Sequence, residues 1–482
     1  MTIKDLKPAL VFSIFDQINQ VPRPSKKEEK IRQYLLDFAA EHNIAVRTDA
    51  VVVMTVPATP GCENAPMVVM QSHMDMVCES NDKNFDFNTQ PIRTIIDGEW
   101  LRADGTTLGA DNGIGMAASL AALIDKDLVH GPLEALFTVD EETGLTGANN
   151  LGEGMIEGSI LLNLDSEDDA EIFVGCAGGV DTTCTFNYKR SFAPTDFHFF
   201  RLEISGGLGG HSGGDIHLGR ANANKLLARF LYTLSLEHEV SLAEIDGGNL
   251  RNAIPRAAHA VFGVDTARKE SVRVAFNKFV ADIEVEYKGI EPTLHFELST
   301  EERPEYAIDL DTTMRLLEAL YSAPHGVVSM SRDLEGLVET STNLASVKML
   351  PDSKVLVTTS QRSSVESRKW DIARQVEALF RLAGAEVTHG DGYPGWAPDM
   401  NSRIMRIASD AYEELYGVKP AIKAIHAGLE CGLFRAKYPH LDMVSFGPTL
   451  RDVHSPSERM HIPAVERFWG QLTRTLEKVA KE

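Results

Sequence analysis

Histidine and carboxylate side chains follow directly after several apolar runs of this chain. They are His73 with Asp75, Asp111, Glu141 with Glu142, Asp165 and, near the C-terminus, His454. In an open α/β sheet, groups just beyond the carboxyl ends of parallel strands face one crevice. The pattern therefore predicts one site, assembled from several strand ends, that is rich enough in carboxylate and imidazole to hold two divalent metal ions.

The first two segments each have a second interpretation. His73 and Asp75 form a His-x-Asp pair in which one residue can bind a metal and the other can orient it, because a metal-bound histidine usually donates its second ring N–H to a carboxylate or carbonyl. The pair also fits a loop histidine beside a helix-capping aspartate. Asp111 opens a predicted helix and could be only its N-cap. Gly109 and Gly113 around it indicate a close backbone approach, and a carboxylate can bridge two cations.

Glu141 and Glu142 are the least ordinary feature. Adjacent carboxylates after an apolar run repel each other unless cations or separate roles absorb their charge. One glutamate would bind metal and leave its neighbour free as a general base, although an acidic surface turn has the same sequence. Asp165 alone could also be a cap. His461 competes with His454 for the role of ligand, and the sequence does not choose between them.

Mixed nitrogen and oxygen ligation suits zinc, with cobalt and manganese as substitutes. Two such ions about 3.5–4 Å apart can clamp a hydrolytic water and polarise a carbonyl group. The residue types and their spacing therefore favour metal-assisted hydrolysis.

Composition excludes several other functions. The 482 residues carry a net charge of −23, which argues against nucleic acid as a partner because phosphate binding needs a basic face. No apolar run approaches the roughly 20 residues of a membrane span, and the N-terminus lacks the apolar core of a signal peptide. The five cysteines are scattered and form no CxxC pair, which is typical of reduced thiols. We therefore expect a cytoplasmic protein.

The periodicity of apolar residues predicts an α/β protein of two domains. Helices are expected over residues 6–18, from a cap at Ser25 to residue 41, and over 112–126, with strands at 67–71, 133–138 and 159–163. After about residue 185 the order becomes β-α-β-β-α, twice, which suggests ferredoxin-like units. A Gly- and Pro-containing segment at 390–396 marks a boundary. The prediction is a catalytic domain with a largely parallel sheet, residues 1–186 and 397–482, and an inserted α+β lid domain, residues 187–396.

The chain resembles metallopeptidase family M20, and within it the aminoacyl-histidine dipeptidase branch. The resemblance extends from Val21 to Ile462. It rests on the candidate ligands above and on five specific strings at 107–116, 209–214, 251–256, 393–396 and 426–434. One departure is Ser457, where relatives usually have aspartate.

The resemblance implies a role for each candidate. His73 and Asp165 would bind one zinc ion, Glu142 and His454 the other, and Asp111 would bridge them. Asp75 would orient His73, and Glu141 would be the general base for a water activated by the two ions. The family also has a cis peptide after the bridging aspartate, here Asp111-Asn112.

Residues of the lid would complete the site. His211, in a glycine-rich loop, would stabilise the oxyanion of the tetrahedral intermediate, from its own chain or from a partner. Asn252 and Arg362 would hold the substrate, with Arg332 and Arg368 as alternatives to Arg362. Gly428 and Glu430 would face the substrate from the catalytic domain, and Glu430 would meet its free amino group.

The resemblance therefore implies a dizinc dipeptidase for Xaa-His dipeptides such as carnosine, and a homodimer; the charge and the lack of a long apolar run predict no nucleic-acid or membrane partner. Amidohydrolases of N-acyl amino acids and tripeptidases share the same metal set and stay as alternatives. An inactive metal-binding scaffold is a further alternative, although all five ligand candidates and Glu141 are present.

Overall fold

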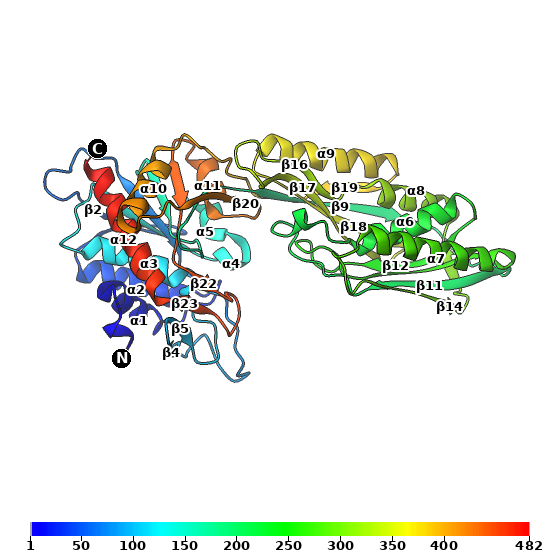
Figure 1. The fold of residues 1–482 in the computed structure, drawn as a ribbon, viewed down its shortest axis with the longest axis horizontal. Helices are drawn as coiled ribbons and strands as arrows, with labels where there is room; N and C mark the ends of the chain where they lie inside the picture. Colours follow the sequence, from blue (N-terminus) through cyan, green and yellow to red (C-terminus); the bar gives the residue numbers. More distant parts are fainter. Residues whose placement is uncertain (1, 482) are drawn as a thin grey trace. The chain divides into compact units, whose positions relative to one another are not determined.

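The computed structural model describes residues 2–481, which divide into two compact units (Figure 1). The first unit comprises Met1–Cys176, Trp396–Ala424 and Leu429–Glu482, and the second comprises Ala177–Gly395 and Ile425–Gly428. This division cuts the chain at residue 176, whereas the sequence analysis expected a boundary at residue 186. Which unit performs catalysis stays a prediction.

The first unit is built on an eight-stranded sheet. Its strands lie in the order β1 (Ala45–Thr48), β2 (Val52–Val56), β6 (Leu133–Thr138), β3 (Val68–His73), β7 (Ile160–Asn163), β21 (Asp442–Ser445), β8 (Glu171–Cys176) and β20 (Ala421–Ile425). The central strands β6, β3, β7 and β21 run parallel to one another. Their carboxyl ends therefore lie at one edge of the sheet, which is what a site made from strand ends requires.

The central strands are buried on both faces. Every residue of β3 and of β6 is buried, which explains why both are rich in apolar residues and show no alternation of apolar and polar positions. Helices cover the sheet (Figure 1). They are α1 (Ala9–Ile18), α2 (Glu29–Glu41), α3 (Ala110–Ile124), α4 (Glu141–Gly144), α5 (Thr146–Asn150), α10 (Arg403–Tyr416), α11 (Glu430–Lys437) and α12 (Ile462–Lys481). A small sheet of β22 (Leu450–Arg451), β23 (Arg459–His461), β5 (Trp100–Ala103) and β4 (Thr94–Asp97) completes the unit.

Two predicted helix starts differ from the structure. The first helix begins at Ala9, after Pro8, rather than at Leu6. The prediction that Ser25 caps the second helix was wrong, because α2 begins only at Glu29. The Ser25 hydroxyl instead donates to Asp75 Oδ2 at 2.8 Å. A partner fifty residues away therefore outcompetes the local cap.

The second unit contains a nine-stranded antiparallel sheet and four long helices. The strands of the main path are β14 (His295–Glu301), β11 (Phe197–Ser205), β13 (Ala258–Asp265), β12 (Ser241–Gly247), β17 (Val338–Leu350), β18 (Lys354–Ser363), β9 (Gly178–Asn187) and β19 (Glu386–His389), and β16 (Gly326–Met330) pairs with β17. The helices are α6 (Ala223–Ser235), α7 (Lys269–Glu286), α8 (Leu310–Ser322) and α9 (Glu366–Leu382). They share one apolar core with the sheet, and Figure 1 shows them along it in green and yellow. Two short strands, β10 (Arg190–Phe192) and β15 (Tyr306–Ile308), pair separately.

This sheet consists of two ferredoxin-like halves, as predicted. The run β11-α6-β12-β13-α7-β14 has its strands in the spatial order fourth, first, third, second, and the run β9-α8-β17-β18-α9-β19 has the same order. The first half is inserted between β9 and α8 of the second. The halves join edge to edge, where Gly247 pairs with Val347.

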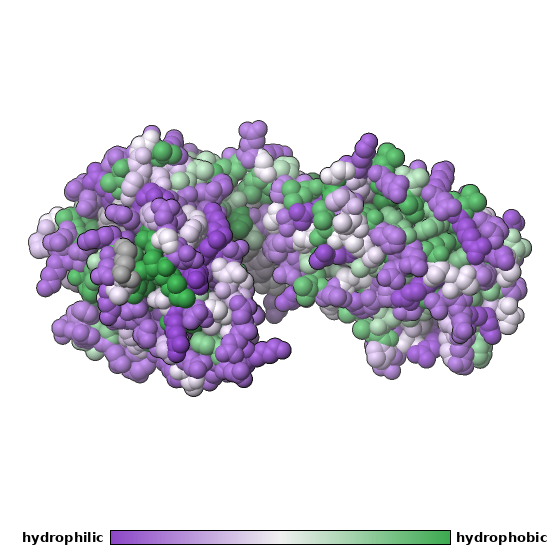
Figure 2. All heavy atoms as spheres, turned by 60° about the horizontal axis from the view of Figure 1, so that its bottom comes forward, coloured by the Kyte–Doolittle hydropathy of each residue, from purple (hydrophilic) through white to green (hydrophobic). Residues whose placement is uncertain are grey.

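Among residues 2–481, no helix combines the length and the apolar composition of a membrane span. The face shown in Figure 2 is mostly hydrophilic, with apolar residues in small groups between the polar ones.

Candidate metal centre

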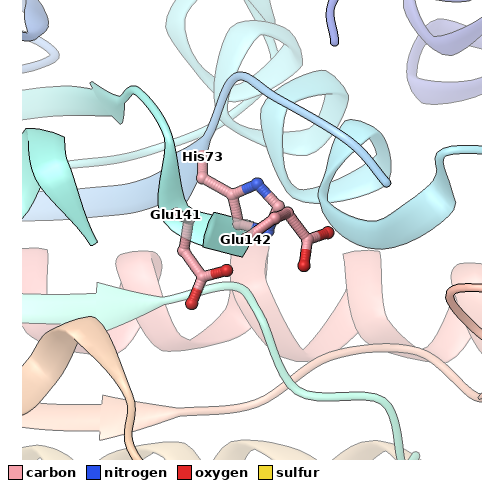
Figure 3. Close-up of side chains that lie close together, drawn as sticks. All are labelled: His73, Glu141 and Glu142. Carbon is pink, nitrogen blue, oxygen red and sulfur yellow. The ribbon is translucent and has the colours of Figure 1, made fainter. Parts of the chain in front are cut away.

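Three strand ends of the eight-stranded sheet supply four of the candidate site residues, and Asp111 lies at the start of α3. His73 is the last residue of β3, Glu141 and Glu142 open the short helix α4 after β6, and Asp165 follows β7 by two residues. His454 comes from the loop between β22 and β23. Figure 3 shows His73, Glu141 and Glu142 close together, with the two carboxylates pointing in different directions. Adjacent glutamates can therefore serve separate functions.

Asp111 lies between the two histidines. Its Oδ1 is 3.0 Å from His73 Nε2, and its Oδ2 is 3.1 Å from His454 Nε2. His73 Nε2 is also 3.3 Å from Asp165 Oδ1, and His454 Nε2 is 3.1 Å from Glu142 Oε2. The result is two clusters of one histidine and two carboxylates that share Asp111. In each cluster the potential ligand atoms all lie within 4.8 Å of one another.

The structure also separates the two competing histidines of the C-terminal loop. His461 packs against Trp100, with the rings tilted and their centroids 5.0 Å apart, and it faces the carboxylate of Glu99 at 3.9 Å. His454 alone of the two reaches Asp111. His454 lies in the loop before β23 and His461 is the last residue of that strand, so only the tertiary arrangement shows which of them faces Asp111.

Asp75 lies behind His73 and beneath the pair of glutamates. Its Oδ1 is 3.4 Å from His73 Nδ1, and the carboxylate accepts from the backbone N–H groups of Glu141 at 3.0 Å and Glu142 at 3.3 Å. Burial by itself would raise the pKa of Asp75. The hydrogen bonds from His73, Ser25 and Glu141 outweigh burial and hold this pKa at about 2. Asp75 is therefore an ionised anchor for both neighbouring segments.

The remaining acidic groups are held close together against their mutual repulsion. Burial raises the pKa of Glu141 well above its ordinary range, and the charges of Asp165, Glu430 and Glu142 add to this effect. Burial likewise raises the pKa of Asp165 to about 6. Hydrogen bonds to Asp111 and Glu142 raise the pKa of His454 to about 11. These shifts all indicate an excess of negative charge that positive charge would relieve.

Divalent cations fit this arrangement of donors. Glu142 Oε1 is buried and has no hydrogen-bond partner among the described residues. A buried carboxylate oxygen without a partner is costly in a folded protein, and a bound cation would remove that cost. His73, Asp111 and Asp165 could hold one ion, and Asp111, Glu142 and His454 a second. The peptide bond between Asp111 and Asn112 is cis, which confirms the expectation from the resemblance.

Glu430 is buried directly below this centre. Its Oε2 accepts from Gln71 Nε2 at 2.6 Å and from Thr138 Oγ1 at 2.9 Å, whereas its Oε1 has no partner among the described residues. Burial raises the pKa of Glu430 to about 8. Gln71 in turn accepts from Asn163 Nδ2, so β3, β6 and β7 all contribute to this layer. Glu430 is 1% exposed, so the side chains that cover it would have to move before it could contact a substrate amino group as predicted.

The other predicted substrate residues belong to the second unit. His211 Nδ1 accepts from the backbone N–H groups of Gly213 at 3.2 Å and Gly214 at 3.0 Å. The proton of a neutral ring must then sit on Nε2, where it can be donated. Burial and the charge of Arg362 lower the pKa of His211, which favours this neutral form.

Asn252 and Arg362 line one cavity of about 780 Å³ within the second unit. Arg362 Nη1 donates to Tyr393 Oη at 2.9 Å, and Tyr393 lines the same cavity. The alternative Arg368 pairs with Glu339 at 3.2 Å, and Arg332 is exposed. Gly428 lies against Tyr393, since a Cβ atom added there would meet the tyrosine ring at 2.8 Å.

Two buried charged residues near Asp111, Arg23 and Glu458, received no role from the sequence. Both contact the backbone of Gly109. Charged residues in Pro-rich or polar loops usually lie in solvent, so the sequence held no signal that these two are buried.

Comparison with known proteins agrees with the fold. The sequence matches Peptidase family M20/M25/M40 over residues 69–478. The cytosol non-specific dipeptidase of Escherichia coli (strain K12) is 42% identical over 483 residues, which cover 99% of each chain. The crystal structure of aminoacylhistidine dipeptidase from Vibrio alginolyticus superposes with a TM-score of 0.94 and 44% identity, over 99% of this chain and 98% of that one. A tripeptidase from Staphylococcus aureus, with a TM-score of 0.58 and 15% identity over 99% of this chain and 100% of that one, shares the fold.

A mixed α/β sheet with parallel central strands and two histidine–carboxylate clusters beyond their ends, in a chain that also forms an α+β unit, is the arrangement of a metallopeptidase. The chain belongs to peptidase family M20/M25/M40.

Proposed function

We propose that this protein is a metal-dependent dipeptidase that hydrolyses Xaa-His dipeptides, including carnosine. The observation that carries the proposal is Asp111, which lies between two histidine–carboxylate clusters beside the adjacent carboxylates of Glu141 and Glu142. The names of the relatives from Escherichia coli and Vibrio alginolyticus support the class of substrate.

Zinc is the proposed metal, with cobalt or manganese as substitutes. His73 and Asp165 would hold one ion, Glu142 and His454 the other, and Asp111 both. When bound, the ions supply Lewis-acid activation of water and of the scissile carbonyl group. Asp75 keeps the ring of His73 in place through its contact with Nδ1.

Glu141 is the proposed general base. Its carboxylate points in a different direction from that of Glu142 (Figure 3), and burial raises its pKa well above the ordinary range of a carboxylate, which favours uptake of a proton. It accepts the proton of the attacking water and hands that proton to the leaving amine nitrogen. The hydrogen bond from the backbone N–H of Glu141 to Asp75 helps to hold the proposed base in position.

The second unit is proposed to act as a lid over the first. His211 would donate from Nε2 to the oxyanion of the tetrahedral intermediate, because its Nδ1 is already occupied by two backbone donors. Arg362 suits the terminal carboxylate of a dipeptide, and Asn252 lines the same cavity. Gly428 and Glu430 are the proposed contacts at the amino end. We also propose a cytoplasmic homodimer, for which the name of the Escherichia coli relative supports the compartment.

Metal analysis combined with a substrate panel tests the proposal. The protein, loaded in turn with zinc, cobalt and manganese, is assayed against Xaa-His dipeptides, carnosine, other dipeptides, a tripeptide and N-acetyl amino acids. Hydrolysis confined to dipeptides, with about two metal ions per chain, is the expected result. Deacylation without dipeptide cleavage would replace the proposal with an amidohydrolase, and cleavage of the tripeptide alone with a tripeptidase.

A further inference from the structure

A buried glutamate holds the backbone of the segment that carries Asp111. Glu458 is 2% exposed, and its Oε2 accepts from the N–H groups of Leu108 at 2.7 Å and Gly109 at 2.9 Å. Its Oε1 accepts from Ala110 at 2.8 Å and, more weakly, from Asp111 at 3.4 Å. The first N–H groups of a helix have no partner within the helix. One distant side chain therefore caps α3 in place of a local residue.

A buried arginine holds the same segment from its other side. Arg23 is 1% exposed, and its Nη1 donates to the carbonyl groups of Asp75 at 2.8 Å and Met74 at 3.3 Å. Its Nη2 donates to the carbonyl group of Gly109. Gly109 thus presents its C=O to Arg23 and its N–H to Glu458. Glycine is required here, because its φ is +66° and an added Cβ atom would lie 2.5 Å from Arg23 Nη2.

The segment that supplies Glu458 also supplies His454. Glu458 N–H donates to the carbonyl group of Ser455 at 3.0 Å, and Ser455 Oγ donates to that of Asp452 at 2.7 Å. The side chain of His454 is 49% exposed, so packing around the ring does little to fix it. The buried anchor of this turn is Glu458, four residues further along the chain.

We propose that Glu458 is a positioning residue for the metal position formed by Asp111, Glu142 and His454, and that Arg23 supports it from the opposite side of Gly109. The inference rests on the proposed two-metal site. Glu458 sets the distance between Asp111 and His454, because it binds the backbone of one and belongs to the turn of the other. The position formed with His73 and Asp165 depends on strand ends instead and should be affected less.

The test compares the isosteric substitution Glu458→Gln with an isosteric substitution of another buried glutamate, Glu134→Gln. Glu458→Gln leaves only one acceptor oxygen for four N–H donors. We expect one of the two equivalents of Co²⁺ to bind about 10–100-fold more weakly, as for other residues that orient metal ligands. The visible absorption of that equivalent should also change. Binding is measured by competition with a chelator, and Glu458→Asp, which keeps both oxygens, should recover part of the affinity.

Glu134→Gln is the matched control. Glu134 is also fully buried in the first unit, accepts from the N–H groups of Glu157 at 2.9 Å and Gly158 at 3.0 Å, and pairs with Arg47. It lies near the start of β6, whereas the site follows the end of that strand. The control should lower the Tm by a similar amount but leave both equivalents of Co²⁺ with their affinity and absorption unchanged.

Unchanged affinity for both equivalents in Glu458→Gln would overturn the inference. If this variant does not fold, Glu458→Asp and Arg23→Lys replace it, and unchanged Co²⁺ binding in both of them overturns the inference equally. His454→Ala separates this inference from the proposed function. If His454→Ala loses one equivalent while the Glu458 variants lose none, only the positioning role fails, whereas two retained equivalents in His454→Ala refute the ligand set itself.

Discussion

The carboxylate oxygen Oδ1 of Asp75 accepts a hydrogen bond from the backbone N–H of Glu141 at 3.0 Å. The same oxygen lies 3.4 Å from Nδ1 of His73. One buried anion therefore fixes both a candidate metal ligand and the candidate base. The backbone of Glu141 and the ring of His73 are therefore linked through this one residue. Changes at Asp75 should consequently affect both metal binding and turnover, whereas changes at the two partners should separate these properties.

Replacement of the base should abolish turnover without loss of metal. Glu141→Gln keeps the shape of the side chain but cannot accept a proton, so we expect kcat for a Xaa-His dipeptide to fall by about 10²–10⁴-fold. Metal content, measured by elemental analysis, should stay that of the unchanged protein. Glu142→Gln is the control, because it removes a proposed ligand and should lower the metal content. Full turnover in Glu141→Gln would show that another group takes the proton.

Replacement of a ligand histidine should lower metal content, whereas replacement of its neighbour in sequence should not. We expect His454→Ala to lose one metal equivalent, because its Nε2 faces both Asp111 and Glu142. His461→Ala removes a ring of the same type that packs against Trp100 outside both clusters. Elemental analysis after dialysis measures both variants. Loss of metal in His461→Ala alone would reverse the assignment.

Arg362 should determine recognition of the free carboxylate. For Arg362→Lys we expect KM for a dipeptide to rise by about tenfold or more, since lysine lacks the planar fork that binds a carboxylate through two nitrogens. The C-terminal amide of the same dipeptide should be hydrolysed equally poorly by both proteins. Arg368→Lys is the control, because Arg368 pairs with Glu339. An equal loss on dipeptide and amide would assign Arg362 a structural role instead.

Stability of the second unit should fall in mild acid because of His426. Its Nε2 lies 2.7 Å from Ser341 Oγ, and burial, with the charge of Arg362, lowers its pKa to about 3. The unfolded chain binds a proton at this residue below about pH 6.5, whereas the folded chain does not. The folded state therefore loses up to ~1.4 kcal/mol for each pH unit between about 6.5 and 3. At higher pH both states are neutral and the effect vanishes.

Denaturant unfolding at about pH 7 and about pH 5, on either side of the ordinary histidine pKa, measures this effect. His426→Gln should unfold with a smaller difference in free energy between the two pH values than the unchanged protein shows. An identical difference in the two proteins would mean that His426 takes up its proton in the folded state as readily as in the unfolded one.

The sequence was most informative about features that depend on residues close together in the chain. Each metal ligand candidate on the first sheet lies at or shortly after the end of a mainly apolar strand, so the change from apolar residues to histidine or carboxylate located it. The two ferredoxin-like halves were visible as a repeated order of elements for the same reason.

Other features depend on contacts between distant residues. Glu458 and Arg23 bind backbone groups that any residue possesses, so no side-chain pattern marks their partners. The choice between His454 and His461 required the three-dimensional path of one loop. β9 appeared to continue the first domain because a complete half of the second sheet separates it from α8 in the sequence, although it pairs with β18 along its whole length.

The order of segments along the chain has a consequence for biosynthesis. The residues after β21, which include His454 and Glu458, leave the ribosome only when the entire second unit has already been made. On the proposed ligand set, a polypeptide that ends before His454 contains His73, Asp111 and Asp165 but lacks one ligand of the second cluster, which consists of Asp111, Glu142 and His454. Hydrolytic competence would thus arrive only near the end of translation, and unfinished copies would be inert.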